Sequence, residues 1–419
     1  MKMKIMKSGF CAVAAIGISL ALNNPAVAGR SITTLESINS SGIKGNSGSY
    51  QPEVSSDGTF VAFVSAADNL DGVTNGFMNV FVRDTLNGTT ERVSVSKTGG
   101  APDGASGSIS ISADGRYVAF SSEATNLVSG DTNGFRDVFV RDRATGTTEL
   151  ISADGNLPSF FTSISADGRY VAFDSNANNL VADDTNNAQD VFIKDRDTGV
   201  IERVTSSGVE PDNITRYPAI SADGSYVAFL SYATNLVSGD TNGRSDIFVY
   251  DRSTGAIDRV SVSSSGAQGD NSCDDVPAIS ADGSQVAFRS RSSNLVGVAT
   301  NGYDNIFVHD MATGATEIAS VNSKGEAGNN YSNHPAISAD GNYVAFESGA
   351  DNLVKNASGA NVYYRDRAAG STNVVADGNG SSSFAAISGD GLKVAFQSYA
   401  TDLSRDDNDS LSDIYMNAR

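Results

Sequence analysis

The sequence predicts an all-β protein, a seven-bladed β-propeller built from four-stranded antiparallel blades. Three observations predict this fold: seven copies of one motif, a strand pattern within each copy, and chain ends that complement each other. The copies centre on an Asp-Gly turn whose Asp is Asp57, Asp114, Asp167, Asp223, Asp282, Asp340 or Asp390. Subtracting neighbouring positions gives spacings of 50 to 59 residues, which is typical of repeat architectures.

The fourth copy shows the elements of one repeat. Its apolar residues alternate with polar ones in four short runs, which we expect to be strands at 218–221, 226–231, 246–251 and 256–261. The first two runs are joined by Ala222-Asp223-Gly224, in which Asp bonds its own backbone and Gly supplies a positive φ. One such sheet cannot bury both of its faces alone, so it must pack against its copies.

The two ends of the chain favour a closed ring over an open solenoid. The seventh copy ends at Asp413–Met416, in the third-strand pattern, and lacks a fourth strand. Residues 31–38 precede the first copy and align with the fourth-strand pattern at 89–94. We therefore expect the N-terminal strand to complete the last blade, which leaves no sheet edge open.

Residues 1–28 have the features of a signal peptide. Lysines precede the apolar run 9–22, and Ala26-Val27-Ala28 matches a cleavage site, so cleavage is expected after Ala28. The propeller would then occupy residues 29–419. We expect a soluble monomer without a membrane span, located in the periplasm or secreted.

Charge and cysteine content narrow the possible partners. The formal net charge of -20 argues against nucleic acid and is compatible with divalent cations or with simple solubility. Cys11 would be lost with the signal peptide, which leaves Cys273 alone. An unpaired cysteine in an exported protein is either a tolerated thiol or a group for intermolecular pairing.

The repeat motif resembles that of the TolB-type, WD40-like β-propeller family. The shared pattern is S-A-D-G-x-Y-V-A-F-x-S followed by D-[IV]-F-V-x-D, and it covers essentially the whole mature chain. The resemblance implies the fold far more than a function. The family pattern usually has Pro at positions held here by Ala113, Ala166, Ala222, Ala281 and Ala339. TolB itself also carries an N-terminal α/β domain, which this sequence does not show between the signal peptide and the first blade strand.

The loop between the second and third strands carries a D-x-[ND]-x-x-x-D pattern. It gathers three oxygen-bearing side chains on a tight turn, as Ca²⁺ requires. Four copies have it, at Asp131, Asn133 and Asp137; Asp184, Asn186 and Asp190; Asp240, Asn242 and Asp246; and Asp407, Asp409 and Asp413. Two copies lose both flanking acids together, with Val73 and Asn79 in one, and Ala299 and Asn305 in the other. The alternative is turn chemistry without a metal, because Asp and Asn also cap turns.

A second set of residues lies six positions before each turn Asp. In a propeller these residues would surround the mouth of the central channel, on the face that carries the long loops. The set is Gln51, Ser108, Phe161, Tyr217, Val276, His334 and Phe384. We take Phe161, Tyr217, His334 and Phe384 as candidate ligand-binding residues, for a sugar, a peptide or another ligand with an apolar face. The alternative is that they pack between blades.

These observations favour a binding or scaffold module for a protein or glycan partner, stabilised by Ca²⁺ at its loops. The rival is a propeller enzyme, a lyase or hydrolase that acts at the channel mouth. Its support is thin, because His309 and His334 are the two histidines and no nucleophile motif accompanies them. A third possibility is a structural surface protein, which would associate with itself.

Overall fold

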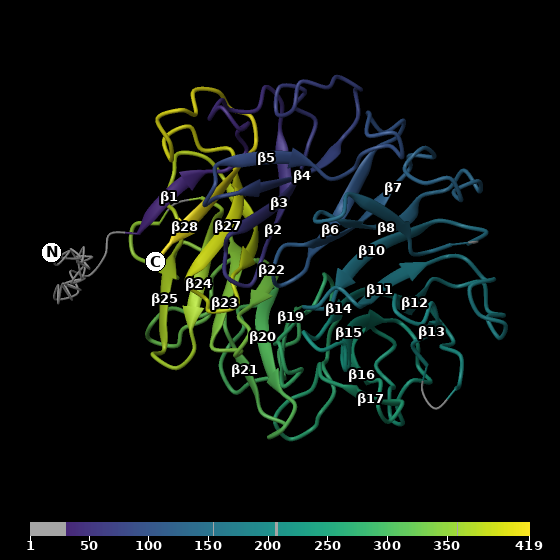
Figure 1. Cartoon of the computed structure of the whole chain (residues 1–419). Coiled ribbons are helices and arrows are strands. Elements are labelled where there is room, and N and C mark those ends of the chain that lie inside the picture. The colour runs from purple at the N-terminus through teal and green to yellow at the C-terminus, as the bar shows by residue number, and fades with distance from the viewer. Residues whose placement is uncertain (1–30, 154, 206–207, 358) are drawn as a thin grey trace, which may run out of the picture.

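The computed structural model describes residues 31–153, 155–205, 208–357 and 359–419. The predicted signal peptide lies outside the described residues, so its cleavage remains a prediction. Within the described residues, 28 strands form seven four-stranded antiparallel sheets arranged around a common centre (Figure 1). The predicted seven-bladed propeller is thereby confirmed.

The strands of the blades are as follows. Blade one contains β2 (Ser49–Val54), β3 (Phe60–Ser65), β4 (Asn79–Asp84) and β5 (Thr89–Arg92). Blade two contains β6 (Ser106–Ile111), β7 (Tyr117–Ser122), β8 (Asp137–Asp142) and β9 (Thr147–Leu150). Blade three contains β10 (Ser159–Ile164), β11 (Tyr170–Ser175), β12 (Asp190–Asp195) and β13 (Ile201–Arg203). Blade four contains β14 (Thr215–Ile220), β15 (Tyr226–Ser231), β16 (Asp246–Asp251) and β17 (Ala256–Arg259).

The remaining blades follow the same order. Blade five contains β18 (Ala278–Ile279), β19 (Gln285–Ser290), β20 (Asn305–Asp310) and β21 (Thr316–Ile318). Blade six contains β22 (Ser332–Ile337), β23 (Tyr343–Ser348), β24 (Asn361–Asp366) and β25 (Ser371–Val374). Blade seven contains β26 (Ser382–Ile387), β27 (Lys393–Ser398), β28 (Asp413–Ala418) and the N-terminal β1 (Ile32–Leu35). In the fourth copy the second and third strands match the prediction, while the first begins earlier and the fourth ends sooner.

The ring closes as the chain ends predict. β1 pairs antiparallel with β28, and Ile32 opposes Ala418 while Leu35 opposes Tyr415. Figure 1 shows this purple strand beside the yellow C-terminal strands. Blade seven is therefore made from both ends of the chain.

The core lies between blades. Seven hydrophobic clusters occur among the described residues, and each joins two neighbouring sheets; the cluster with Val191 and Phe229, for example, joins blades three and four. Each blade also stacks one aromatic ring of its second strand on one of its third, as Phe229 does on Phe248 at 5.8 Å between centroids. Both faces of every sheet are used, because each blade packs against two neighbours.

The short turns between first and second strands form a ring of hydrogen bonds. The residue before each turn Asp donates its backbone N–H to the carbonyl oxygen of its counterpart in the next blade, at 2.8 to 3.0 Å. The chain of donors is Ser56, Ala113, Ala166, Ala222, Ala281, Ala339 and Gly389, and the last donates back to Ser56. Proline has no N–H. Alanine at these positions therefore allows a closed circle of backbone bonds.

Candidate functional site

A cavity of about 340 Å³ lies in the central channel. All seven first strands or their approaches line it, through positions 51–53, 108–110, 161–163, 218–220, 275–279, 334–337 and 384–387. Six of the seven residues predicted for the channel mouth are in its wall, namely Gln51, Ser108, Phe161, Val276, His334 and Phe384. The seventh, Tyr217, contacts Phe161 edge-on with 4.5 Å between ring centroids.

The four candidate ligand-binding residues form two ring pairs at this mouth. Phe161 and Tyr217 come from blades three and four. His334 and Phe384 come from blades six and seven, and their ring centroids lie 4.0 Å apart. All four side chains are half-buried. Each pair joins two neighbouring blades at the channel mouth. These side chains therefore lie at the predicted channel position and also pack between blades, which was the alternative.

The backbone at the mouth is strained in a regular way. Gln51, Ser108, Tyr217, His334 and Phe384 have φ angles between 48° and 60°, a region that L-residues rarely adopt. In six blades the pairing of first and second strands shifts register here, as it does between Arg216 and Ala219. Such bulges re-aim side chains, and backbone strain of this kind clusters at functional sites.

Buried side chains satisfy several of the displaced backbone amides. Asp174 accepts from the N–H of Tyr217 at 2.9 Å and from that of Phe161 at 3.2 Å. Asp275 accepts from the N–H of His334 at 2.7 Å, and Gln397 accepts from that of Gln51 at 3.0 Å.

Sequence reasoning missed Asp174, Asp275 and Glu347. Two of them, Asp174 and Glu347, stand in the second-strand position that the other blades fill with Val64, Ser121, Leu230, Arg289 or Gln397. Because this position varies from apolar to charged among the blades, the sequence alone did not mark the two acids.

His334 is held between two carboxylates. Its Nδ1 lies 3.2 Å from Glu347 Oε2, and its Nε2 lies 3.7 Å from Asp275 Oδ1. Burial alone would lower the pKa of His334, but the hydrogen bond that His334 donates to Glu347 and the two negative charges outweigh it and raise the pKa. Burial likewise acts to raise the pKa of Glu347, and the bond to His334 reverses this into a lowered pKa. The pair therefore favours an imidazolium beside a carboxylate.

Two further acids near the channel are kept from ionising easily. Burial raises the pKa of Glu53, which lines the cavity, to about 7. Burial also raises the pKa of Asp174 to about 7, against the hydrogen bonds from the two mouth amides. The channel mouth thus combines aromatic rings with carboxyl groups whose pKa values are raised by burial.

The loops with the D-x-[ND]-x-x-x-D pattern lie away from the channel cavity, outside its lining. Their middle residue performs turn chemistry. Asn133, for example, accepts from the N–H of Phe135 at 2.8 Å and donates to the carbonyl of Gly155 at 2.9 Å. Asn186 and Asn242 make the corresponding contacts in blades three and four.

In two of the four loops, acids gather as a metal site would require. Carboxylate oxygens of Asp184, Asp190 and Glu210 lie within 4.8 Å of one another, and those of Asp407, Asp409 and Asp413 do the same. By the number and spacing of their carboxylate oxygens alone, these two clusters suit a metal ion. The choice of Ca²⁺ remains a prediction.

Cys273 is unpaired and buried. Burial raises the pKa of its thiol to about 12, so the thiolate is scarce at neutral pH. This buried position favours a thiol without a function over a group for intermolecular pairing.

No family model and no curated protein matches the chain. Solved structures of similar fold include an oligogalacturonate lyase in complex with manganese, with 14% identity, a TM-score of 0.56, and coverage of 92% of this chain and 96% of that one. An oligogalacturonate lyase from Vibrio parahaemolyticus has 15% identity, a TM-score of 0.55, and coverage of 89% and 90%. A putative TolB from Agrobacterium tumefaciens has 19% identity, a TM-score of 0.41, and coverage of 65% and 80%. At these identities the similarity to the two lyases concerns the propeller fold alone. Among the described residues, no helix has the length and apolarity that a membrane crossing needs.

Proposed function

We propose that this protein is an exported binding module that holds a protein or glycan partner at the mouth of its central channel. The observation that carries the proposal is the ring of first-strand residues around the channel. Phe161, His334 and Phe384 line the cavity, and Tyr217 packs edge-on against Phe161. Aromatic faces with a few polar groups bind sugars and peptide side chains. Export rests on the sequence features of residues 1–28 and gives a periplasmic or secreted protein.

Three of the four acids named near the mouth support binding more than hydrolysis. Asp174 and Asp275 are engaged by backbone amides of the ring, and Glu347 by His334. These carboxylates fix the shape of the opening. A glycosidase needs two carboxyl groups that face the substrate from opposite sides of a bond.

The test is a binding screen of the mature chain against pooled glycans and peptides. Phe161→Ala and Phe384→Ala should each weaken binding of a ligand at least tenfold, since each removes a large buried contact area. Leu86→Ala is the matched control, because Leu86 is 76% exposed on the turn between β4 and β5. Equal affinity for all three variants would refute the channel mouth as the binding site.

The alternative is a lyase or hydrolase at the same opening. The observation that favours it is His334, a proton donor between two carboxylates beside a cavity. Turnover of pooled oligosaccharides or esters that is lost in His334→Gln would establish catalysis. Ligand binding without any turnover would leave the binding module as the function. Any stabilising Ca²⁺ would act at the outer loops, away from this mouth.

A further inference from the structure

The seven blades allow an internal comparison at the metal-like loops. The fourth strand of each blade places one residue beside the loop between its second and third strands. In blades one to six that residue is Arg92, Leu150, Arg203, Arg259, Ile318 or Val374. For each blade we compare two features: whether this fourth-strand residue is a cation, and whether the two flanking acids of the loop are present.

In blade three the arginine takes the place of a metal ion. Nη1 of Arg203 lies 3.5 Å from Asp184 Oδ1 and 3.3 Å from Asp190 Oδ2. The same nitrogen is 2.7 Å from Glu210 Oε1. One guanidinium charge therefore already lies at the centre of this acidic cluster and offsets part of its negative charge.

Blade four repeats the arrangement. Nη1 of Arg259 lies 3.2 Å from Asp240 Oδ1 and 3.8 Å from Asp246 Oδ2. The two flanking acids again share one cationic nitrogen.

Blade seven reaches the same result by another route. Its fourth strand is β1, which carries Leu35 at the equivalent position. Lys44, from the segment after β1, supplies the charge instead. Its Nζ lies 2.9 Å from Asp413 Oδ2, 2.7 Å from Asp409 Oδ1 and 3.5 Å from Asp407 Oδ1.

Blade five has neither acids nor cation. Ala299 and Asn305 replace the acids, and Ile318 replaces the arginine. The Asn305 amide donates to the carbonyls of Thr300 and Tyr303, which keeps the loop closed without charge.

Among the described residues, blade two alone has both flanking acids and no cation beside them. Blade one shows the reverse: it keeps Arg92 without the two flanking acids, and Arg92 pairs with Asp71 instead, at 2.8 Å. In blade two, Asp131 and Asp137 are both present, while the arginine is replaced by Leu150. Asp131 is 7% exposed and neither of its carboxylate oxygens has a hydrogen-bond partner. Asp137 is fully buried, and its Oδ1 accepts from Ser152 at 2.6 Å. Within the described residues, no Lys, Arg or His nitrogen forms an ion pair with either acid.

Three of the four carboxylate oxygens of this pair are buried without a hydrogen-bond partner: both oxygens of Asp131 and Oδ2 of Asp137. At neutral pH a buried carboxylate pair with no counter-charge is strongly unfavourable.

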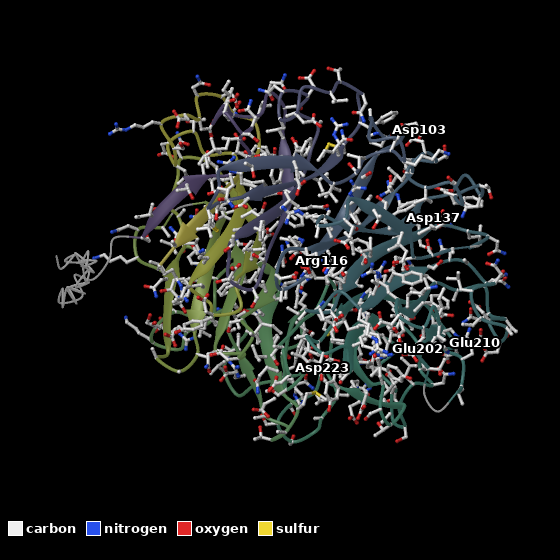
Figure 2. All side chains as sticks on the ribbon, in the orientation of Figure 1. Asp103, Arg116, Asp137, Glu202, Glu210 and Asp223 are labelled. Carbon is white, nitrogen blue, oxygen red and sulfur yellow. The ribbon has the colours of Figure 1, made fainter. Side chains whose placement is uncertain are left out.

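Asp103 and Asp137 lie on the same outer side of the ring as Glu210 of blade three (Figure 2).

We infer that the loop of blade two binds one hard divalent cation between Asp131 and Asp137, and that the acidic loops of blades three, four and seven do not. The cation takes the position that Arg203 Nη1 holds in blade three. Carboxylate oxygens suit Ca²⁺, and water would complete the coordination. This site lies away from the channel mouth, so its test does not depend on the proposed function.

The test is the number of Ca²⁺ ions bound per mature chain, measured by isothermal titration calorimetry after metal stripping. We expect one ion for the wild type and none for Leu150→Arg, which installs the counter-ion of blade three. Asp131→Asn should weaken binding at least tenfold. Arg203→Leu, the reciprocal change, should raise the number to two. Circular dichroism shows whether each variant keeps its fold.

If Arg203→Leu does not fold, the wild type and Leu150→Arg still decide the question. A wild type that binds no Ca²⁺ or Mg²⁺ at millimolar concentration overturns the inference. So does a Leu150→Arg chain that binds as many ions as the wild type. Loss of binding in Leu150→Arg with an intact fold supports it, and a second ion in Arg203→Leu establishes the exchange of arginine for metal.

Discussion

Ser37 Oγ donates a hydrogen bond of 2.7 Å to Asp413 Oδ1, between residues 376 positions apart in the chain. Ser152 and Asp137 make the equivalent bond inside blade two, and Ser261 and Asp246 make it inside blade four. The last blade therefore repeats, with both ends of the chain, a contact that other blades form locally. Closure of the ring depends on residues 31–44, which include β1, Ser37 and Lys44.

Removal of this segment should open the ring. A chain that begins at residue 45 leaves the edge of β28 unpaired and Asp413 without Ser37 and Lys44. We expect a lower midpoint of thermal unfolding and concentration-dependent association, since open edges recruit other strands. Calorimetry and analytical ultracentrifugation measure both. A truncated chain that stays monomeric with an unchanged midpoint would contradict this role of the N-terminal strand.

In five blades the glycine of the Asp-Gly turn lies against an aromatic ring of the preceding blade. Gly224 has a φ of 74°, and a Cβ at this position would lie 2.2 Å from Cδ2 of Tyr170. Gly255 has a φ of 72° with nothing within 4 Å of an added Cβ. Gly255→Ala should lower the free energy of unfolding by about 1–2 kcal/mol, the cost of a left-handed conformation with a side chain.

Gly224→Ala should cost a further ~1–3 kcal/mol, because Tyr170 must move. Urea unfolding of the two variants gives the comparison. Equal losses would mean that the blade contact at Gly224 adapts without cost.

The circle of backbone bonds at the short turns predicts an effect of proline. Ala222 donates its N–H to the carbonyl of Ala281 at 2.9 Å. Ala222→Pro removes this donor, so the free energy of unfolding should fall by about 1–3 kcal/mol. Ala222→Ser keeps the N–H and serves as the control. If chemical denaturation finds the two variants equally stable, the circle contributes little.

His334 and His309 should titrate on opposite sides of the usual histidine value. Glu347 and Asp275 raise the pKa of His334 above 6.5 in spite of its burial. Burial lowers the pKa of His309, whose Nδ1 lies 2.8 Å from Thr316 Oγ1. The stability from the His334 pair is fully present below the unfolded pKa and is lost as the pH rises through the folded pKa.

With two histidines in the chain, proton NMR can resolve both curves. His334→Gln assigns them and should remove the stability loss on the alkaline side. A His334 curve at or below 6.5 would show that its carboxylate neighbours do not control its charge.

The sequence alone determined the blade number, the four-stranded repeat, the closure by residues 31–38 and the positions at the channel mouth. These features follow from local periodicity and from turns such as Asp223-Gly224, whose chemistry acts within a few residues. The sequence also located the acidic loops, because their spacing is regular. It did not show which residues neutralise them.

Only the tertiary structure decided the charge balance of these loops and the shape of the mouth. Arg203 and Lys44 reach their carboxylates from a different strand and from the opposite end of the chain. The amides of Phe161 and Tyr217, from two blades, both donate to Asp174. The backbone bulge that allows this contains no glycine that would have indicated it in the sequence. Such contacts depend on distances between elements far apart in sequence, and the free energy of a buried charge depends on what the fold places beside it.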